Sequence, residues 1–110
     1  MSLTVNVYYT GAGGSARAFA DEMVASGTVD AIRAQPGNLR YAYFFPMDDP
    51  ETLLLIDSWT DQESLDRHHA SPMMDRIAML RERHDLHMRV ERYISDEGGM
   101  PADDEKHIRS

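Results

Sequence analysis

The fold of this chain is decided by the stretch Asp57-Ser58-Trp59-Thr60-Asp61-Gln62-Glu63-Ser64-Leu65-Asp66-Arg67-His68-His69-Ala70-Ser71-Pro72. It begins at the end of an apolar run over residues 52–59, which predicts a strand. Thr60 and Glu63 have the spacing of a capping box, so a helix is expected to follow with Thr60 as its N-cap. Ser71-Pro72 predicts a second helical start, because serine caps helices and proline suits their first position.

Periodicity places the other elements on either side of that stretch. Runs of β-branched and aromatic residues, or strict alternation of apolar and polar residues, predict strands. Apolar residues recurring three and four positions apart predict helices. The predicted segments are strands at residues 3–10, 39–46 and 86–94 and helices at residues 15–26, 29–34 and 73–84.

The predicted order of elements is strand, helix, strand, strand, helix, strand. Two strand–helix–strand crossovers in one antiparallel sheet give the ferredoxin-like split βαββαβ arrangement. We therefore expect one α+β domain over residues 1–97, with a four-stranded antiparallel sheet and helices on one face, followed by a polar tail over residues 98–110. Because the strand at residues 52–59 is almost continuously apolar, the other sheet face also needs cover, and a second protomer in a homodimer is the simplest cover.

The charge balance and composition exclude several classes of protein. The 110-residue chain has 19 acidic and 11 basic residues and a formal net charge of -8, whereas nucleic acids and anionic membrane surfaces are bound through clustered Lys and Arg. Basic and acidic side chains alternate at residues 81–83 and 89–92, and we interpret both segments as solvated faces. Cysteine is absent, so no disulfide or thiolate site is expected. With no apolar run of about 20 residues and no signal-peptide pattern, a cytoplasmic location is expected.

Two adjacent histidines are the first candidates for chemistry. His68 and His69 follow Leu65 by three and four residues, so at least one is expected to lean toward the sheet. One interpretation is a hydrogen-bonded histidine at the edge of the core, and the other is a pocket histidine that acts as a base near neutral pH. Adjacent helical residues point about 100° apart, so a shared metal ion is not expected.

Polar and aromatic residues in the strands are the second group of candidates. Trp59 is either a core anchor or a ligand contact, and Asp57 shares its strand face. A carboxylate among apolar neighbours needs a partner or a raised pKa. Asn6 interrupts an apolar strand, so its amide points either to a sheet edge or into a cavity, and Tyr8 shares its face.

The pattern formed by Asp57, Trp59, Leu65, His68 and Ser71-Pro72 resembles that of the antibiotic-biosynthesis-monooxygenase family, over roughly residues 3–95. The resemblance implies a homodimeric α+β barrel in which each protomer holds its own pocket between sheet and helices. It also implies oxygenation of quinol-like or polycyclic phenolic small molecules, with molecular oxygen as co-substrate and without flavin, haem or metal. A deprotonated phenol is itself electron-rich enough to reduce oxygen.

The same resemblance implies roles for particular side chains. His68 is expected to take or share the phenolic proton, and Asn6 is expected to bond a carbonyl or peroxy oxygen of the substrate. The expected substrate-binding residues are Trp59, Tyr8, Tyr41, Tyr43, Phe44 and Asp57.

Three other functions of the same fold stay open at this point. One is a dimer without catalysis that binds a small molecule or serves in stress response, and another is an isomerase. A third, haem degradation, is disfavoured because its pattern needs Trp at the position of His68 and a ligating His at the position of Ala78. An open apolar cavity lined by Asn6, Trp59 and His68 would favour the oxygenase, and a closed one would favour the protein without catalysis.

Overall fold

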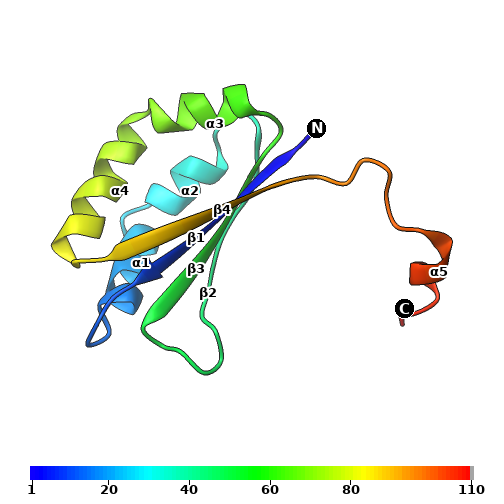
Figure 1. Cartoon of the computed structure of the whole chain (residues 1–110). Coiled ribbons are helices and arrows are strands. Elements are labelled where there is room, and N and C mark those ends of the chain that lie inside the picture. The colour runs from blue at the N-terminus through cyan, green and yellow to red at the C-terminus, as the bar shows by residue number, and fades with distance from the viewer. Residues whose placement is uncertain (110) are drawn as a thin grey trace.

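The structure is a computed structural model that describes residues 1–109, and it contains an antiparallel sheet with helices on one side (Figure 1). The elements are β1 (Leu3–Thr10), α1 (Ser15–Ala25), α2 (Thr28–Arg33), β2 (Asn38–Phe44), β3 (Thr52–Trp59), α3 (Gln62–His69), α4 (Pro72–Arg83), β4 (His87–Ile94) and α5 (Ala102–Glu105). The strand order is β2-β3-β1-β4, with every pair antiparallel. The predicted α+β, ferredoxin-like fold is confirmed.

Alternation along the strands divides the sheet into two faces. On β1, Val5, Val7 and Tyr9 are buried, whereas Asn6 and Tyr8 between them are only half-buried. The buried set points toward α1 to α4, and we call this side of the sheet the covered face. We call the other side, where none of the described helices packs, the open face (Figure 1). A strand has a period of two, so each residue of β1 belongs to one face only.

The adjoining strand β3 repeats this alternation. Asp57 pairs with Val5 and Leu55 with Val7 on the covered face. Leu54 and Ile56 lie on the open face and are half-buried. The nearly continuous apolar sequence of β3 therefore places apolar side chains on both sides of the sheet, as expected.

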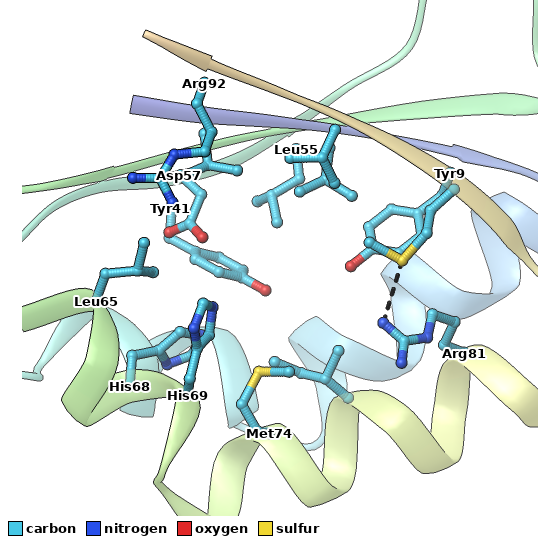
Figure 2. Close-up of a pocket in the computed structure, with 15 residues that line it drawn as sticks. Tyr9, Tyr41, Leu55, Asp57, Leu65, His68, His69, Met74, Arg81 and Arg92 are labelled. Atoms are coloured by element: carbon cyan, nitrogen blue, oxygen red, sulfur yellow. Dashed lines mark hydrogen bonds between the residues drawn. The ribbon is translucent and has the colours of Figure 1, made fainter. Parts of the chain in front are cut away.

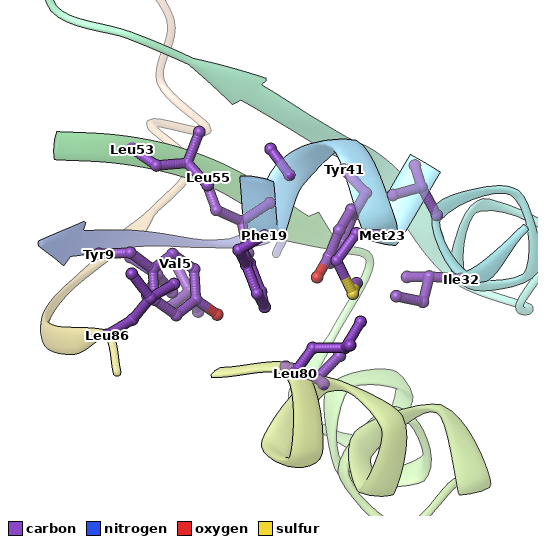
Figure 3. Close-up of a cluster of buried hydrophobic side chains, with 14 of the residues drawn as sticks. Val5, Tyr9, Phe19, Met23, Ile32, Tyr41, Leu53, Leu55, Leu80 and Leu86 are labelled. Carbon is purple, nitrogen blue, oxygen red and sulfur yellow. The ribbon is translucent and has the colours of Figure 1, made fainter. Parts of the chain in front are cut away.

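The core lies between the covered face and the helices. Phe19 and Met23 of α1, Ile32 of α2 and Leu80 of α4 are at most 1 % exposed (Figure 3). The Phe19 ring packs against the Tyr9 ring with centroids 5.1 Å apart. Burying a side chain of this size stabilises the fold by about 1.5–3 kcal/mol, so this layer fixes the helices on the sheet.

Two details differ from the sequence prediction. β2 ends at Phe44, two residues earlier than expected, because Pro46 already begins a turn in which its carbonyl accepts the Asp49 amide N–H at 3.2 Å. The N-cap of α3 is Asp61 rather than Thr60. The Asp61 carboxylate accepts the backbone N–H of Ser64 at 2.8 Å.

The C-terminal segment leaves the body of the molecule. After β4 it extends away from the sheet and forms the short helix α5 (Figure 1). The expected polar tail at residues 98–110 includes this helix, and Ser110 lies outside the described residues. Within residues 1–109, the helices are too short or too polar to cross a membrane.

Candidate functional site

A cavity of about 270 Å³ lies between the covered face and the two helices α3 and α4 (Figure 2). Its walls are mainly apolar, and its few polar side chains gather toward its two ends. The strand wall follows the period of two along β1, and the α4 wall follows helical spacing, so each element presents one stripe to the cavity. The lining residues are Val5, Val7, Tyr9, Tyr41, Leu55, Asp57, Leu65, His68, His69, Met74, Ile77, Arg81, Met88, Val90 and Arg92.

Asp57 is a buried acid at one end of the cavity, which we call the first end. It is 5 % exposed, and its Oδ1 accepts a hydrogen bond from Trp59 Nε1 at 2.7 Å. Burial raises the pKa of the Asp57 carboxyl from 3.8 to about 7, and the hydrogen bond from Trp59 limits the rise. Near neutral pH this group is therefore able both to release and to accept a proton.

His68 lies at the same end of the cavity and is oriented from two sides. Its Nδ1 is 2.8 Å from Gln35 Oε1, and because an amide oxygen only accepts, Nδ1 carries the proton. Nε2 is left as an acceptor. The Trp59 ring stacks on the imidazole at 4.9 Å. Burial, together with the neighbouring His69, lowers the pKa of His68 to about 4, so the ring is neutral at pH 7.

The turn before β2 brings Gln35 to this histidine. Gly37 has φ +86° and its carbonyl accepts the backbone N–H of Thr60 at 2.9 Å. A Cβ at Gly37 would collide with the Ser64 side chain, so only glycine allows the turn to approach α3 this closely. The sequence signalled this turn, but no local pattern indicated that Gln35 contacts a residue 33 positions away.

Tyr9 and Arg81 form the other end of the cavity. The Tyr9 hydroxyl points into it (Figure 2), and burial raises the pKa of that phenol to about 12, an effect that the charge of Arg81 reduces. Arg81 Nη1 donates to Met88 Sδ at 3.2 Å, a weak acceptor. Arg81 is therefore an exception to the interpretation of residues 81–83 as a solvated face, whereas Glu82 and Arg83 are exposed as expected.

Arg92 lies at the edge strand β4 and joins it to α3. Its Nη2 donates to Gln62 Oε1 at 2.6 Å. The side chain is exposed, yet it lines the cavity. Residues 89–92 are exposed except for the half-buried Glu91, in line with their interpretation as a solvated face.

The predicted site residues on the covered face are brought together in part. Asp57, His68 and Tyr41 line the cavity. Trp59 is fully buried behind His68 and contacts Asp57 and His68 rather than the cavity itself. Tyr43 lies on the covered face beside Tyr41, outside the cavity lining.

The remaining predicted residues lie on the open face, which corrects their expected place in one pocket with His68. Asn6 and Tyr8 alternate with Val5 and Val7 along β1 and so point away from the helices. Phe44 pairs with the open-face residue Leu54. Strand alternation therefore excludes the side chains of all three from the cavity lining.

A metal centre has no evident ligand set in residues 1–109. That part of the chain holds no group of three or more His, Asp or Glu side chains arranged to bind a metal ion. Of the two ring nitrogens of His68, Nδ1 is already hydrogen-bonded to Gln35 Oε1 and is therefore not free to bind a metal ion.

Comparison with known proteins agrees with this architecture. A family model described as antibiotic biosynthesis monooxygenase matches residues 2–79. The chain belongs to the antibiotic biosynthesis monooxygenase family. A search of curated protein sequences finds no significant match.

Solved structures share the fold of this family member. PA3566 from Pseudomonas aeruginosa has 26 % sequence identity and a TM-score of 0.72, covering 86 % of this chain and 93 % of its own. SnoaB from Streptomyces nogalater, described as a cofactor-independent oxygenase, has 22 % identity and a TM-score of 0.71, covering 87 % and 94 %. Rv0793 from Mycobacterium tuberculosis has 20 % identity and a TM-score of 0.74, covering 90 % and 100 %. At identities this low, the last two likenesses concern the fold.

Proposed function

We propose that this protein is a cofactor-independent monooxygenase that acts on quinol-like or polycyclic phenolic small molecules. The observation that carries the proposal is the apolar cavity with a neutral His68 and a titratable Asp57 at one buried end. Family membership supports an oxygenase, and the similar fold of SnoaB, described as a cofactor-independent oxygenase, supports chemistry without a cofactor.

Proton transfer begins the proposed reaction. His68 Nε2 accepts a hydrogen bond from the substrate hydroxyl, because Nδ1 already donates to Gln35. His68 passes the released proton on to Asp57, which lines the same end of the cavity and, with a pKa of about 7, is the more basic of the two acceptors. The apolar walls exclude water from the electron-rich phenolate.

The oxygen chemistry then needs only the substrate and O₂. The phenolate supplies electrons to O₂, and a carbon–oxygen bond forms at an activated ring carbon that carries one hydrogen. One oxygen atom stays on that carbon as a quinone carbonyl, and the other leaves as water with that ring hydrogen and the phenolic proton held by Asp57. The substrate is thereby oxidised and no external reductant is consumed.

Trp59 has a positioning role in this proposal. Its indole N–H fixes the Asp57 carboxylate, and its ring supports the His68 imidazole. One buried side chain thus orients both proton acceptors. Tyr41, whose hydroxyl points into the cavity (Figure 2), stays protonated because burial raises its pKa well above 10, and so it can donate a hydrogen bond to the substrate.

The open face is the proposed interface of a homodimer. Leu54 and Ile56 lie there half-buried, and Asn6 Oδ1 is buried without a hydrogen-bond partner among residues 1–109. A second copy packed on this face would cover both apolar side chains and offer Asn6 a partner. A monomeric mass at micromolar concentration in analytical ultracentrifugation would contradict this assembly.

Oxygen consumption tests the enzymatic proposal. We expect wild-type protein to consume O₂ with at least one member of a panel of quinols, naphthols and anthrones. His68→Ala should lower the rate by about 100-fold or more, whereas His87→Ala, a histidine exposed on the surface, should leave the rate unchanged. If the protein binds members of the panel but consumes no O₂ with any of them, it is a small-molecule-binding protein and not an enzyme.

A further inference from the structure

The two ends of the cavity differ in the hydrogen bonds they can make. At the first end Asp57 and His68 Nε2 are acceptors, because Asp57 has only one of its oxygens bonded to Trp59 and His68 uses Nδ1 for Gln35. At the other end, Arg81 offers only N–H donors and Tyr9 a buried hydroxyl. The Asp57–His68 end therefore carries a carboxyl and a ring acceptor beside the donors Tyr41 and Arg92, whereas the Arg81–Tyr9 end carries a cation and a hydroxyl but no acidic side chain (Figure 2).

Arg81 is a cation without an anionic partner. The side chain is half-buried and its described bond is to the Met88 sulfur at 3.2 Å. Within residues 1–109 no carboxylate lies within ion-pair distance of Arg81, although the chain has 19 acidic residues. A partly buried charge with only a weak acceptor is unfavourable until an anion meets it.

The distance between the two ends follows from the elements that carry them. Asp57 pairs with Val5, and Tyr9 lies four residues further along β1, which separates these strand positions by about 13 Å. Side chains reaching inward from both ends shorten that span. A cavity of about 150 Å³ holds one benzene ring, so about 270 Å³ corresponds to roughly two fused rings.

We propose that the cavity binds a bicyclic aromatic ligand with a hydroxyl at the Asp57–His68 end and an anionic oxygen group, such as a carboxylate, at the Arg81–Tyr9 end. This inference rests on the proposed function only in placing the substrate in this cavity. It adds a ligand class, a hydroxylated aromatic acid, and it assigns Arg81 as the residue that selects the anion. Apolar side chains of Val7, Leu55 and Ile77 contact the rings between the ends.

Three naphthalene probes test the ligand class without any turnover. They are 6-hydroxy-2-naphthoate, 2-naphthol, which lacks the carboxylate, and 2-naphthoate, which lacks the hydroxyl. Calorimetric titration of full-length wild-type protein under anaerobic conditions should give a Kd for 6-hydroxy-2-naphthoate at least about 10-fold lower than for either other probe. Equal affinity for 2-naphthol would overturn the proposal, whatever the oxygen-uptake assay shows.

Variants of one helix test the role of Arg81. Arg81→Gln should weaken binding of 6-hydroxy-2-naphthoate by about 10- to 100-fold and change the Kd of 2-naphthol less than 3-fold. Arg76→Gln, on the same helix but outside this cavity, is the matched control and should bind all probes as wild type does. Arg81→Lys should retain part of the preference for the acid.

Arg92 provides the competing location for the anion. If Arg92→Gln abolishes the preference for the carboxylate while Arg81→Gln preserves it, the anion binds at the edge strand and the proposed orientation is overturned. If the preference follows Arg81, the proposal holds even where no oxygen uptake is detected, because binding and turnover are measured separately.

Discussion

The covered and open faces of one sheet are built from alternating residues of the same strands, and the cavity with Asp57 and His68 lies on the covered face. Val5, Val7 and Tyr9 of β1 meet the helices, while Asn6 and Tyr8 meet none. On the covered face, the buried polar side chains of Asp57 and His68 have hydrogen-bond partners in Trp59 and Gln35. On the open face, Arg89 lies over the Tyr8 ring at 3.9 Å, a contact near solvent. The comparison teaches that candidate residues in a strand need to be sorted by face before they are assigned to a site.

The largest expected difference between the faces is in stability. Leu53→Ala, at a fully buried position of the covered face, should lower the free energy of unfolding by about 2–5 kcal/mol. Leu54→Ala, its neighbour on the open face, should lower it by about 1 kcal/mol. Urea denaturation measures both. In the proposed homodimer the effect of Leu54→Ala should also depend on protein concentration. If both variants lose the same free energy of unfolding at every protein concentration, the two faces do not differ in their contribution to stability.

The next largest effect is on the pH dependence of stability. The pKa of Asp57 rises from 3.8 to about 7 on folding, so the folded chain keeps a proton that the unfolded chain releases between about pH 4 and pH 7. Asp57 therefore makes the fold more stable as pH falls through this window. Asp57→Asn should remove that contribution, which amounts to about 4 kcal/mol at most.

His68 changes the stability of the fold in the opposite direction over nearly the same pH range. Its pKa falls from 6.5 to about 4 on folding, so the unfolded chain takes up a proton that the folded chain refuses, and stability is lost on acidification. The two groups largely offset each other in wild type. His68→Gln should leave a protein whose unfolding free energy, relative to wild type, rises on acidification from pH 6.5 to pH 4 by about 3 kcal/mol. The same pH profile for wild type and both variants would contradict the burial of these groups.

The smallest expected effect is on the open face. Asn6→Val replaces an amide whose Oδ1 is buried without a partner in residues 1–109, so the free energy of unfolding should change by about 1 kcal/mol or less. Ligand binding in the cavity should stay at the wild-type value, because the side chain points away from it. A large loss of substrate affinity in Asn6→Val would restore the sequence-based interpretation that placed Asn6 in the pocket.

The sequence predicted the elements because their signals are local. The strands β1 and β4 and the Ser71-Pro72 helix start all appear in the structure where they were expected, although burial alternates with a period of two along β1 and not along β4. The shared face of Asn6 and Tyr8 was also predictable. The sequence did not predict which residues of each strand face the helices, because that depends on how distant segments pack.

The site itself was predictable only in part. Asp57 and His68 could be predicted as site residues because their spacing from Trp59 and Leu65 lies within one stretch of the sequence. Gln35 and Arg81 could not be predicted, because each reaches the cavity through contacts with residues far along the chain. Arg81 in particular sits in a run of alternating charges that has the pattern of a solvated helix face.

The central claim is that oxygenation takes place in the cavity of the covered face, with Asp57 and His68 as its proton acceptors. The most direct test is mass spectrometry of the product formed under ¹⁸O₂ by wild type, Asp57→Asn and Asn6→Val, with a quinol or anthrone from the uptake panel. We predict one ¹⁸O atom per product molecule, formed by wild type and Asn6→Val at equal rates and by Asp57→Asn about 100-fold more slowly. Unlabelled product from wild type, or equal rates for Asp57→Asn and wild type, would contradict the account.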